Sequence, residues 1–138
     1  MAVGIKVDGI IDEIGTADFF HAFFSTISRH LEPEGWGTEF PTLMKELYQG
    51  RLAVRDAPVA LAELKNARHR LRKIAPEHVV WDIEDPSTRP PWGDDISDDI
   101  TDLSSYFVTS TGRDLFDTLA EAFKESSRVN KDATIENC

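Results

Sequence analysis

Cysteine and long hydrophobic runs are the two features that the sequence most clearly lacks. The only cysteine is Cys138, so one chain can form neither a disulfide nor a zinc site built on several thiolates. The longest apolar stretches, such as residues 19–24 with His21 inside them, fall far short of the ~18 residues of a membrane-spanning helix. The first residues include Lys6 and Asp8 and lack the apolar centre of a signal peptide. We therefore expect a cytoplasmic protein with no membrane span.

Positive charge is also scarce. The 138 residues include 15 Lys and Arg against 25 Asp and Glu, which gives a formal net charge of −10 at pH 7. Such a field repels phosphate backbones and anionic lipid surfaces, so we expect no nucleic-acid partner and no membrane partner. The length suits one domain, and a hydrophobic content of 41% lets it bury a core that needs no metal or disulfide.

Catalytic signatures are missing as well. The sequence contains no GxSxG elbow, no Walker loop, no HExxH pair and no paired CxxC. Its four histidines, at 21, 30, 69 and 78, lack ligand spacing, and we interpret His21 as a side chain at the edge of the core. The sequence therefore predicts neither an enzyme nor a bound cofactor.

The order of the predicted elements favours an α+β fold. Alternating apolar and polar residues, or clustered β-branched and aromatic ones, predict strands, whereas apolar residues at intervals of three and four predict amphipathic helices. The predicted strands cover residues 3–8, 79–83 and 105–109, and the predicted helices cover residues 17–31, 40–47, 56–73 and 113–124. Because strand and helix do not alternate strictly, we expect a small, mostly antiparallel sheet of three or more strands packed against about four helices.

Two stretches near the chain ends add to this prediction. The first strand either continues through Asp8 and Gly9 into residues 10–14 or turns back there. A tight hairpin is possible because both residues tolerate positive φ. Residues 126–138 are polar and unpatterned. We therefore expect a single domain of residues 1–125 followed by a frayed C-terminal tail.

The acidic loop, residues 82–102, carries most of the net charge. It holds eight acidic residues against one basic residue, Arg89, and its three prolines and repeated aspartates argue against regular structure. Five basic residues precede it in the second half of the predicted helix over residues 56–73. The dipole of that helix favours cations at its C-terminal end, and an alternative role for them is counter-charge to the acidic loop.

The acidic loop has three possible roles: a solvated loop that keeps the protein soluble, a metal site, or a recognition surface. Its spacing fails the calcium-loop template. Asp82 and Glu84 would share one face of a strand, but no lysine follows at a spacing useful for a metal nuclease. Prolines, Trp92 and a rim of carboxylates instead combine a stiff backbone, an aromatic anchor and charge. Such a surface fits a basic partner and mimics the phosphates that a nuclease cleft binds.

Four stretches of the sequence are distinctive. They read FPTLMKELYQG (residues 40–50), VVWDIEDP (79–86), PPWGD (90–94), and YFVTS followed by GRDLF (106–116). Together they resemble the bacterial polymorphic-toxin immunity proteins, and in particular the immunity protein 70 family, over residues 3–124. The resemblance implies a small cytoplasmic α+β protein, made beside a secreted or contact-delivered toxin, that binds the toxin's C-terminal domain and blocks it. It implies a stoichiometric inhibitor rather than an enzyme.

The predicted contact residues come from the acidic loop and not from the resemblance. They combine carboxylates with one tryptophan: Asp82, Glu84, Asp85, Trp92, Asp94, Asp95, Asp98 and Asp99. We expect them to bind a basic, nuclease-type toxin domain. Trp81 is interpreted as a core residue, and the alternative role of Trp92 is to pin a long loop to the body of the protein.

Two other functions stay open. A metal-dependent hydrolase would use the acidic cluster from Asp82 to Asp99. A structural homo-oligomer would use the exposed end of the phenylalanine-rich helix as its seam, with Phe19, Phe20, Phe23 and Phe24. A monomer and a homodimer are both compatible with the sequence.

Overall fold

A β-hairpin opens the chain. In the computed structural model, which describes residues 2–138, strand β1 (Ala2–Val7) pairs antiparallel with β2 (Ile10–Thr16). The residues between them, Asp8 and Gly9, have φ values of 49° and 85°. Positive φ at both central residues is what a two-residue type I′ turn requires. Of the two alternatives for Asp8 and Gly9, the hairpin is therefore the one that forms.

The C-terminal residues form an interior strand of the sheet. The strand order is β2-β1-β4-β3, where β3 is Arg51–Leu52 and β4 is Ala133–Asn137, and each neighbouring pair is antiparallel. The prediction of a frayed tail over residues 126–138 is therefore wrong. Only Ala133 and Ile135 are apolar in β4, too few for an alternating pattern to stand out. The strand is instead held by backbone hydrogen bonds to neighbours on both sides.

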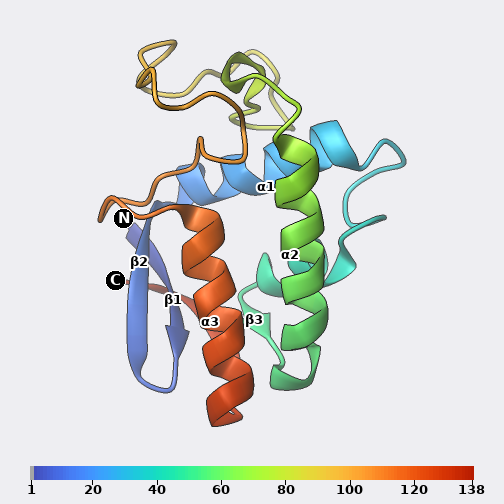
Figure 1. Cartoon of the computed structure of the whole chain (residues 1–138), viewed down its shortest axis with the longest axis vertical. Helices are drawn as coiled ribbons and strands as arrows, with labels where there is room; N and C mark the ends of the chain where they lie inside the picture. The colour runs from blue at the N-terminus through green and yellow to red at the C-terminus, as the bar shows by residue number, and fades with distance from the viewer. Residues whose placement is uncertain (1) are drawn as a thin grey trace.

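Three α-helices accompany this sheet: α1 and α3 pack on it, and α2 packs on the other two helices. They are α1 (Ala17–Leu31), α2 (Ala57–Leu71) and α3 (Leu115–Val129). In Figure 1, α2 and α3 run side by side, α3 packs against β1, and α1 crosses near the ends of both helices. The predicted α+β fold with an antiparallel sheet is confirmed. Within residues 2–138, no helix is both long and apolar enough to cross a membrane.

The predicted helix over residues 40–47 is a short π-helical segment, η1 (Thr42–Leu47). A carboxylate of α2 caps its beginning: Glu63 accepts hydrogen bonds from the N–H groups of Thr42 and Leu43, at 3.3 and 3.0 Å. A second, buried carboxylate, Glu32, accepts three backbone N–H groups in the turn that precedes η1. Both acidic residues therefore serve the fold and are not available to a partner.

The four phenylalanines of α1 lie inside the chain. Phe19 and Phe20 are 7% and 6% exposed, and Phe23 and Phe24 are fully buried. Phe23 packs edge to face against Phe107 with 5.3 Å between the ring centroids. The predicted oligomer seam on this helix is therefore wrong, because the chain itself already covers the rings.

The segments over residues 79–83 and 105–109 are not strands. Residues 105–109 contribute only an isolated bridge between Val108 and Asp114. Tyr106 and Phe107 are neighbours and both are buried, whereas neighbours in a half-buried strand point to opposite faces. The aromatic and β-branched residues mark loops that are buried against helices, so both strand predictions are wrong.

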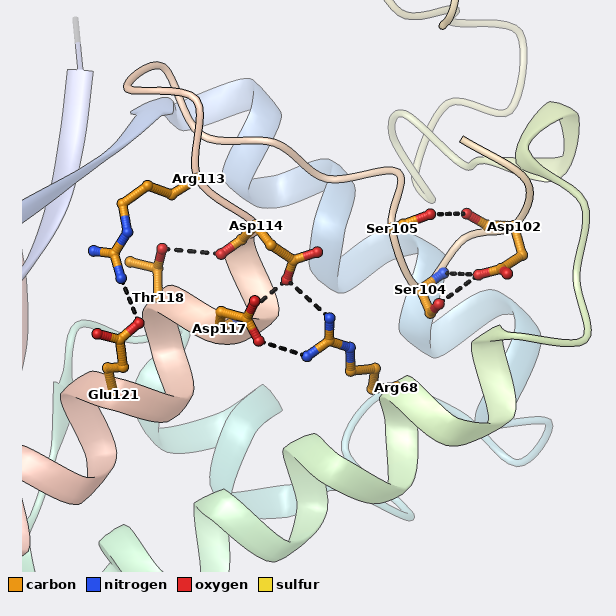
Figure 2. Close-up of polar contacts among 9 residues, drawn as sticks. All are labelled: Arg68, Asp102, Ser104, Ser105, Arg113, Asp114, Asp117, Thr118 and Glu121. Atoms are coloured by element: carbon orange, nitrogen blue, oxygen red, sulfur yellow. Dashed lines mark hydrogen bonds and ion pairs between the residues drawn. The ribbon is translucent and has the colours of Figure 1, made fainter. Parts of the chain in front are cut away.

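Arg68 of α2 ties the start of α3 to α2 (Figure 2). Its guanidinium lies 2.7 Å from the carboxylate of Asp117 and 3.5 Å from that of Asp114. Asp114 is the N-cap residue of α3 and accepts the N–H of Asp117 at 3.0 Å. Burial raises the pKa of Asp114, and the Asp117 N–H and Arg68 oppose that shift only in part.

Replacing Asp114 tests this cap. Asp114→Ala should lower the free energy of unfolding by about 1 kcal/mol, because it removes the N-cap acceptor of α3. Asp114→Asn should cost less, because the amide oxygen still accepts the Asp117 N–H and no charge is buried. Since the folded pKa of Asp114 is raised, the stability of the wild type relative to Asp114→Asn should fall as the pH rises from below 3.8 through that raised value.

Urea unfolding of the wild type and both variants at several pH values measures these differences. Equal losses in Asp114→Ala and Asp114→Asn at neutral pH would contradict the capping role.

Truncation tests the role of β4. Deletion of residues 133–138 should abolish cooperative thermal unfolding, because it removes an interior strand and leaves β1 and β3 without a shared partner. Deletion of the exposed Cys138 alone is the matched control and should keep the transition. Circular dichroism during heating measures both; a cooperative transition in the longer truncation would show that the sheet does not need β4.

Candidate functional site

The acidic loop lies against α1. Figure 1 shows the chain between α2 and α3, in yellow and gold, gathered on the side of α1 opposite the bodies of those two helices. After α2, the chain forms a short 3-10 helix, η3 (Pro76–His78), and then runs along α1. The N–H of Leu103 donates to the carbonyl of Ile74 at 3.0 Å and joins the two ends of this excursion.

Polar side chains of α1 hold residues 79–83, the segment that leads into the acidic loop. Thr26 Oγ1 accepts the N–H of Val80 at 3.0 Å and donates to its carbonyl at 3.1 Å. Ser25 Oγ accepts the N–H of Ile83 at 3.2 Å. Both hydroxyl residues are fully buried. The backbone groups that a strand would pair with a neighbouring strand are thus satisfied by helix side chains, which explains why residues 79–83 are not a strand.

His21 joins three parts of the chain. Its Nδ1 lies 2.8 Å from the hydroxyl of Tyr48, and its Nε2 lies 3.2 Å from Oδ1 of Asp82. The same oxygen of Asp82 accepts the N–H of Glu84 at 2.9 Å. The Glu84 N–H, and then His21, lower the pKa of Asp82. His21 lies at the core edge with 23% of its side chain exposed, and Asp82 is engaged in holding the loop.

Trp92 also attaches the loop while keeping part of its ring exposed. Its indole N–H donates to the hydroxyl of Tyr106 at 2.8 Å. Its ring packs edge to face with that of Trp81, with 5.4 Å between the ring centroids. Trp92 is 39% exposed, and Trp81 is only half-buried at the edge of the core. Pinning of the loop by Trp92 is therefore confirmed; its contact with a partner remains a prediction.

The remaining carboxylates of the predicted site point to solvent. The exposed residues are Glu84, Asp85, Asp94, Asp95, Asp98 and Asp99. Within residues 2–138, none of the six forms an ion pair with Lys, Arg or His. The basic residues of α2 do not neutralise them: Arg68 pairs with Asp114 and Asp117, and Arg70 pairs with Glu39. The predicted counter-charge role toward the acidic loop is therefore wrong for these two arginines.

The metal alternative gains no support from the geometry. Across residues 2–138, no group of three or more His, Cys, Asp or Glu side chains lies close enough to hold a metal ion. Asp82 and Glu84 do not share the face of a strand, because Asp82 instead caps the backbone N–H of Glu84.

The comparison with known protein families decides the family. The model of the family described as immunity protein 70 matches residues 5–135. The chain belongs to the immunity protein 70 family. The match extends past residue 124 and includes the start of β4, and membership supports an immunity role. No curated protein and no solved structure matches the chain.

Several residues of this immunity protein 70 site escaped the sequence analysis. Ser25 and Thr26 hold the loop, and Tyr106 orients Trp92. The available signal was the pair of hydroxyl residues inside the phenylalanine-rich helix, because buried hydroxyl groups need hydrogen-bond partners. Their partner segment could not be identified from sequence, since it lies more than 50 positions away along the chain.

Substitution of Thr26 tests the attachment of the loop. Thr26→Val keeps the shape but removes the hydroxyl that satisfies both backbone groups of Val80, so the segment over residues 79–83 should open locally. We expect hydrogen exchange at the Val80 amide to become about tenfold faster or more, for a loss of about 1–3 kcal/mol. Thr26→Ser, which keeps the hydroxyl, is the control. Unchanged protection of Val80 in Thr26→Val would show that the hydroxyl does not hold the loop.

Proposed function

We propose that this immunity protein 70 member binds a cognate toxin domain and neutralises it by stoichiometric occlusion with its acidic loop. The toxin is a basic, nuclease-type protein, and the inhibitor acts in the cytoplasm without catalysing a reaction. The observation that carries the proposal is the set of six exposed carboxylates that form no ion pair within residues 2–138, beside the half-exposed Trp92.

Electrostatics support a basic partner. Unpaired carboxylates on one loop create a negative potential that speeds the encounter with a positive surface and repels phosphate-bearing competitors. Acidic groups that serve the fold, such as Glu32, Glu63 and Asp114, lie elsewhere. Of the predicted contact residues, Asp82 has the separate task of fixing the loop to His21, and the other seven form the proposed contact surface.

The attachment of the loop supports a defined binding surface rather than a flexible acidic tail. Four side chains of α1 hold residues 78–83, where the chain enters the loop. The bond between Trp92 and Tyr106 holds the middle of the loop, and the bond between Leu103 and Ile74 closes it where the chain leaves. Binding then orders fewer side chains and less backbone, which lowers the entropic cost of association.

Titration of the toxin domain encoded beside this protein tests the proposal. Isothermal titration calorimetry at low salt should give one immunity protein per toxin domain, and the toxin's activity should fall in the same proportion. Affinity should decrease as the salt concentration rises. Absence of binding at low salt, or binding that leaves the toxin fully active, would contradict the proposed function.

Removal of two loop charges separates the acidic loop from the rest of the surface. The double variant Asp94→Asn and Asp95→Asn should slow association about 3- to 10-fold at low salt and reduce the salt dependence. The matched control, Asp8→Asn with Glu34→Gln, removes two exposed charges elsewhere and keeps a residue that tolerates positive φ in the hairpin turn. Stopped-flow kinetics measures both, and equal effects of the two double variants would contradict a localised acidic contact.

A further inference from the structure

A groove opens beside Trp92, between the acidic loop and α1. It has a volume of about 240 Å³, and its apolar lining includes Phe19, Trp92, Ile100, Tyr106 and Val108. Trp92 and Val108 are 39% and 44% exposed and belong to the few large apolar side chains that reach the surface of the described chain. Their convergence on one groove marks a place where a partner side chain can be desolvated.

The polar rim of this groove is negative. Asp95 lines it together with Ser97, and no basic residue does. Arg89, the only base of the acidic loop, lines a neighbouring pocket that shares Ile96 and Tyr106 with the groove. Asp95 is exposed and, within residues 2–138, pairs with no cation. The groove therefore combines apolar walls with an unneutralised carboxylate at its mouth.

The orientation of Trp92 is fixed. Its indole N–H donates to the hydroxyl of Tyr106 at 2.8 Å, and its ring packs at 87° to the ring of Trp81. These two contacts orient the ring while part of it remains accessible. An accessible, oriented indole ring next to a carboxylate is the arrangement that attracts a cation through its π-face.

We propose that this groove receives an arginine side chain of the partner protein, with its stem against Val108 and Ile100, its guanidinium on Trp92 and an ion pair to Asp95. This inference rests on the proposed function, of which it specifies the anchoring contact. Arginine fits better than lysine, because a planar guanidinium stacks on an aromatic ring and binds a carboxylate through two N–H groups at once. A lysine ammonium is more strongly hydrated and loses more on entering an apolar groove.

Blocking the groove tests the proposal in the toxin complex. Val108→Arg places a cation of the chain's own at the groove and should weaken toxin binding about tenfold or more. Val59→Arg is the matched control, because Val59 is a similarly exposed valine on α2, at 51% exposure against 44% for Val108, and the charge change is the same. Equal affinities of the two variants for the toxin would overturn the groove proposal and leave one-to-one binding, and thus the proposed function, intact.

A toxin-free measurement covers the case in which the proposed function itself fails. N-acetyl-arginine methylamide should shift the indole N–H resonance of Trp92 saturably, with a dissociation constant in the millimolar range expected of so small a ligand. The citrulline analogue, which is neutral and of similar shape, should not shift it, and neither compound should do so in Val108→Arg. An absent shift, or equal shifts with citrulline, would overturn the proposal. A lysine analogue that binds as tightly would overturn the preference for arginine.

Discussion

The burial of α1 on nearly all of its sides is the constraint on which the rest of the molecule depends. One side of the helix carries phenylalanines that pack into the core over the sheet, α2 and α3. The other side carries Ser25 and Thr26, which are equally buried because residues 79–83 lie on them. A hydroxyl group in this position is stable only while a backbone group pairs with it. The helix and the loop therefore stabilise each other, and neither is a complete structure alone.

This mutual dependence sets what the acidic loop can do. Residues 79–83, which lead into the loop, bond to side chains of α1, and His21 holds Asp82. This part of the chain therefore belongs to the core. The middle of the loop, from Glu84 to Asp99, is mostly exposed, and Pro90, Trp92 and Ile96 are the residues through which it packs on the body. A fixed base with an exposed, charged middle is suited to presenting a surface, because the geometry is preserved while the side chains remain accessible.

The sequence predicts the parts of this arrangement whose signal is local. The apolar spacing of α1, α2 and α3 identifies these three helices, because helix period depends on nearby residues. The chemistry of Asp8 and Gly9 offers the hairpin turn as one of two alternatives. Prediction from the sequence fails for segments that are stabilised by partners far away along the chain. β4 has too little apolar pattern to stand out, and residues 79–83 have a strand-like pattern but pair with helix side chains instead. The acidic character of the site is visible in composition, whereas the groove at Trp92 and Val108 depends on a fold that brings residues 19, 92 and 108 together.

The placement of basic residues explains why the acidic loop stays available to a partner. Four arginines pair with carboxylates outside the loop. Arg51 pairs in the turn before β4, and Arg68 pairs at the start of α3. Arg70 pairs in the turn before η1, and Arg113 pairs with β2 and α3. These four arginines are thus used in internal contacts, and within residues 2–138 none of the six exposed carboxylates of the predicted site pairs with a cation. Two copies of such a loop repel each other, so this face disfavours self-association and favours a partner of opposite charge. In the proposed complex with a toxin domain, apolar contact in the groove slows dissociation, and the long-range attraction of the acidic loop speeds the approach.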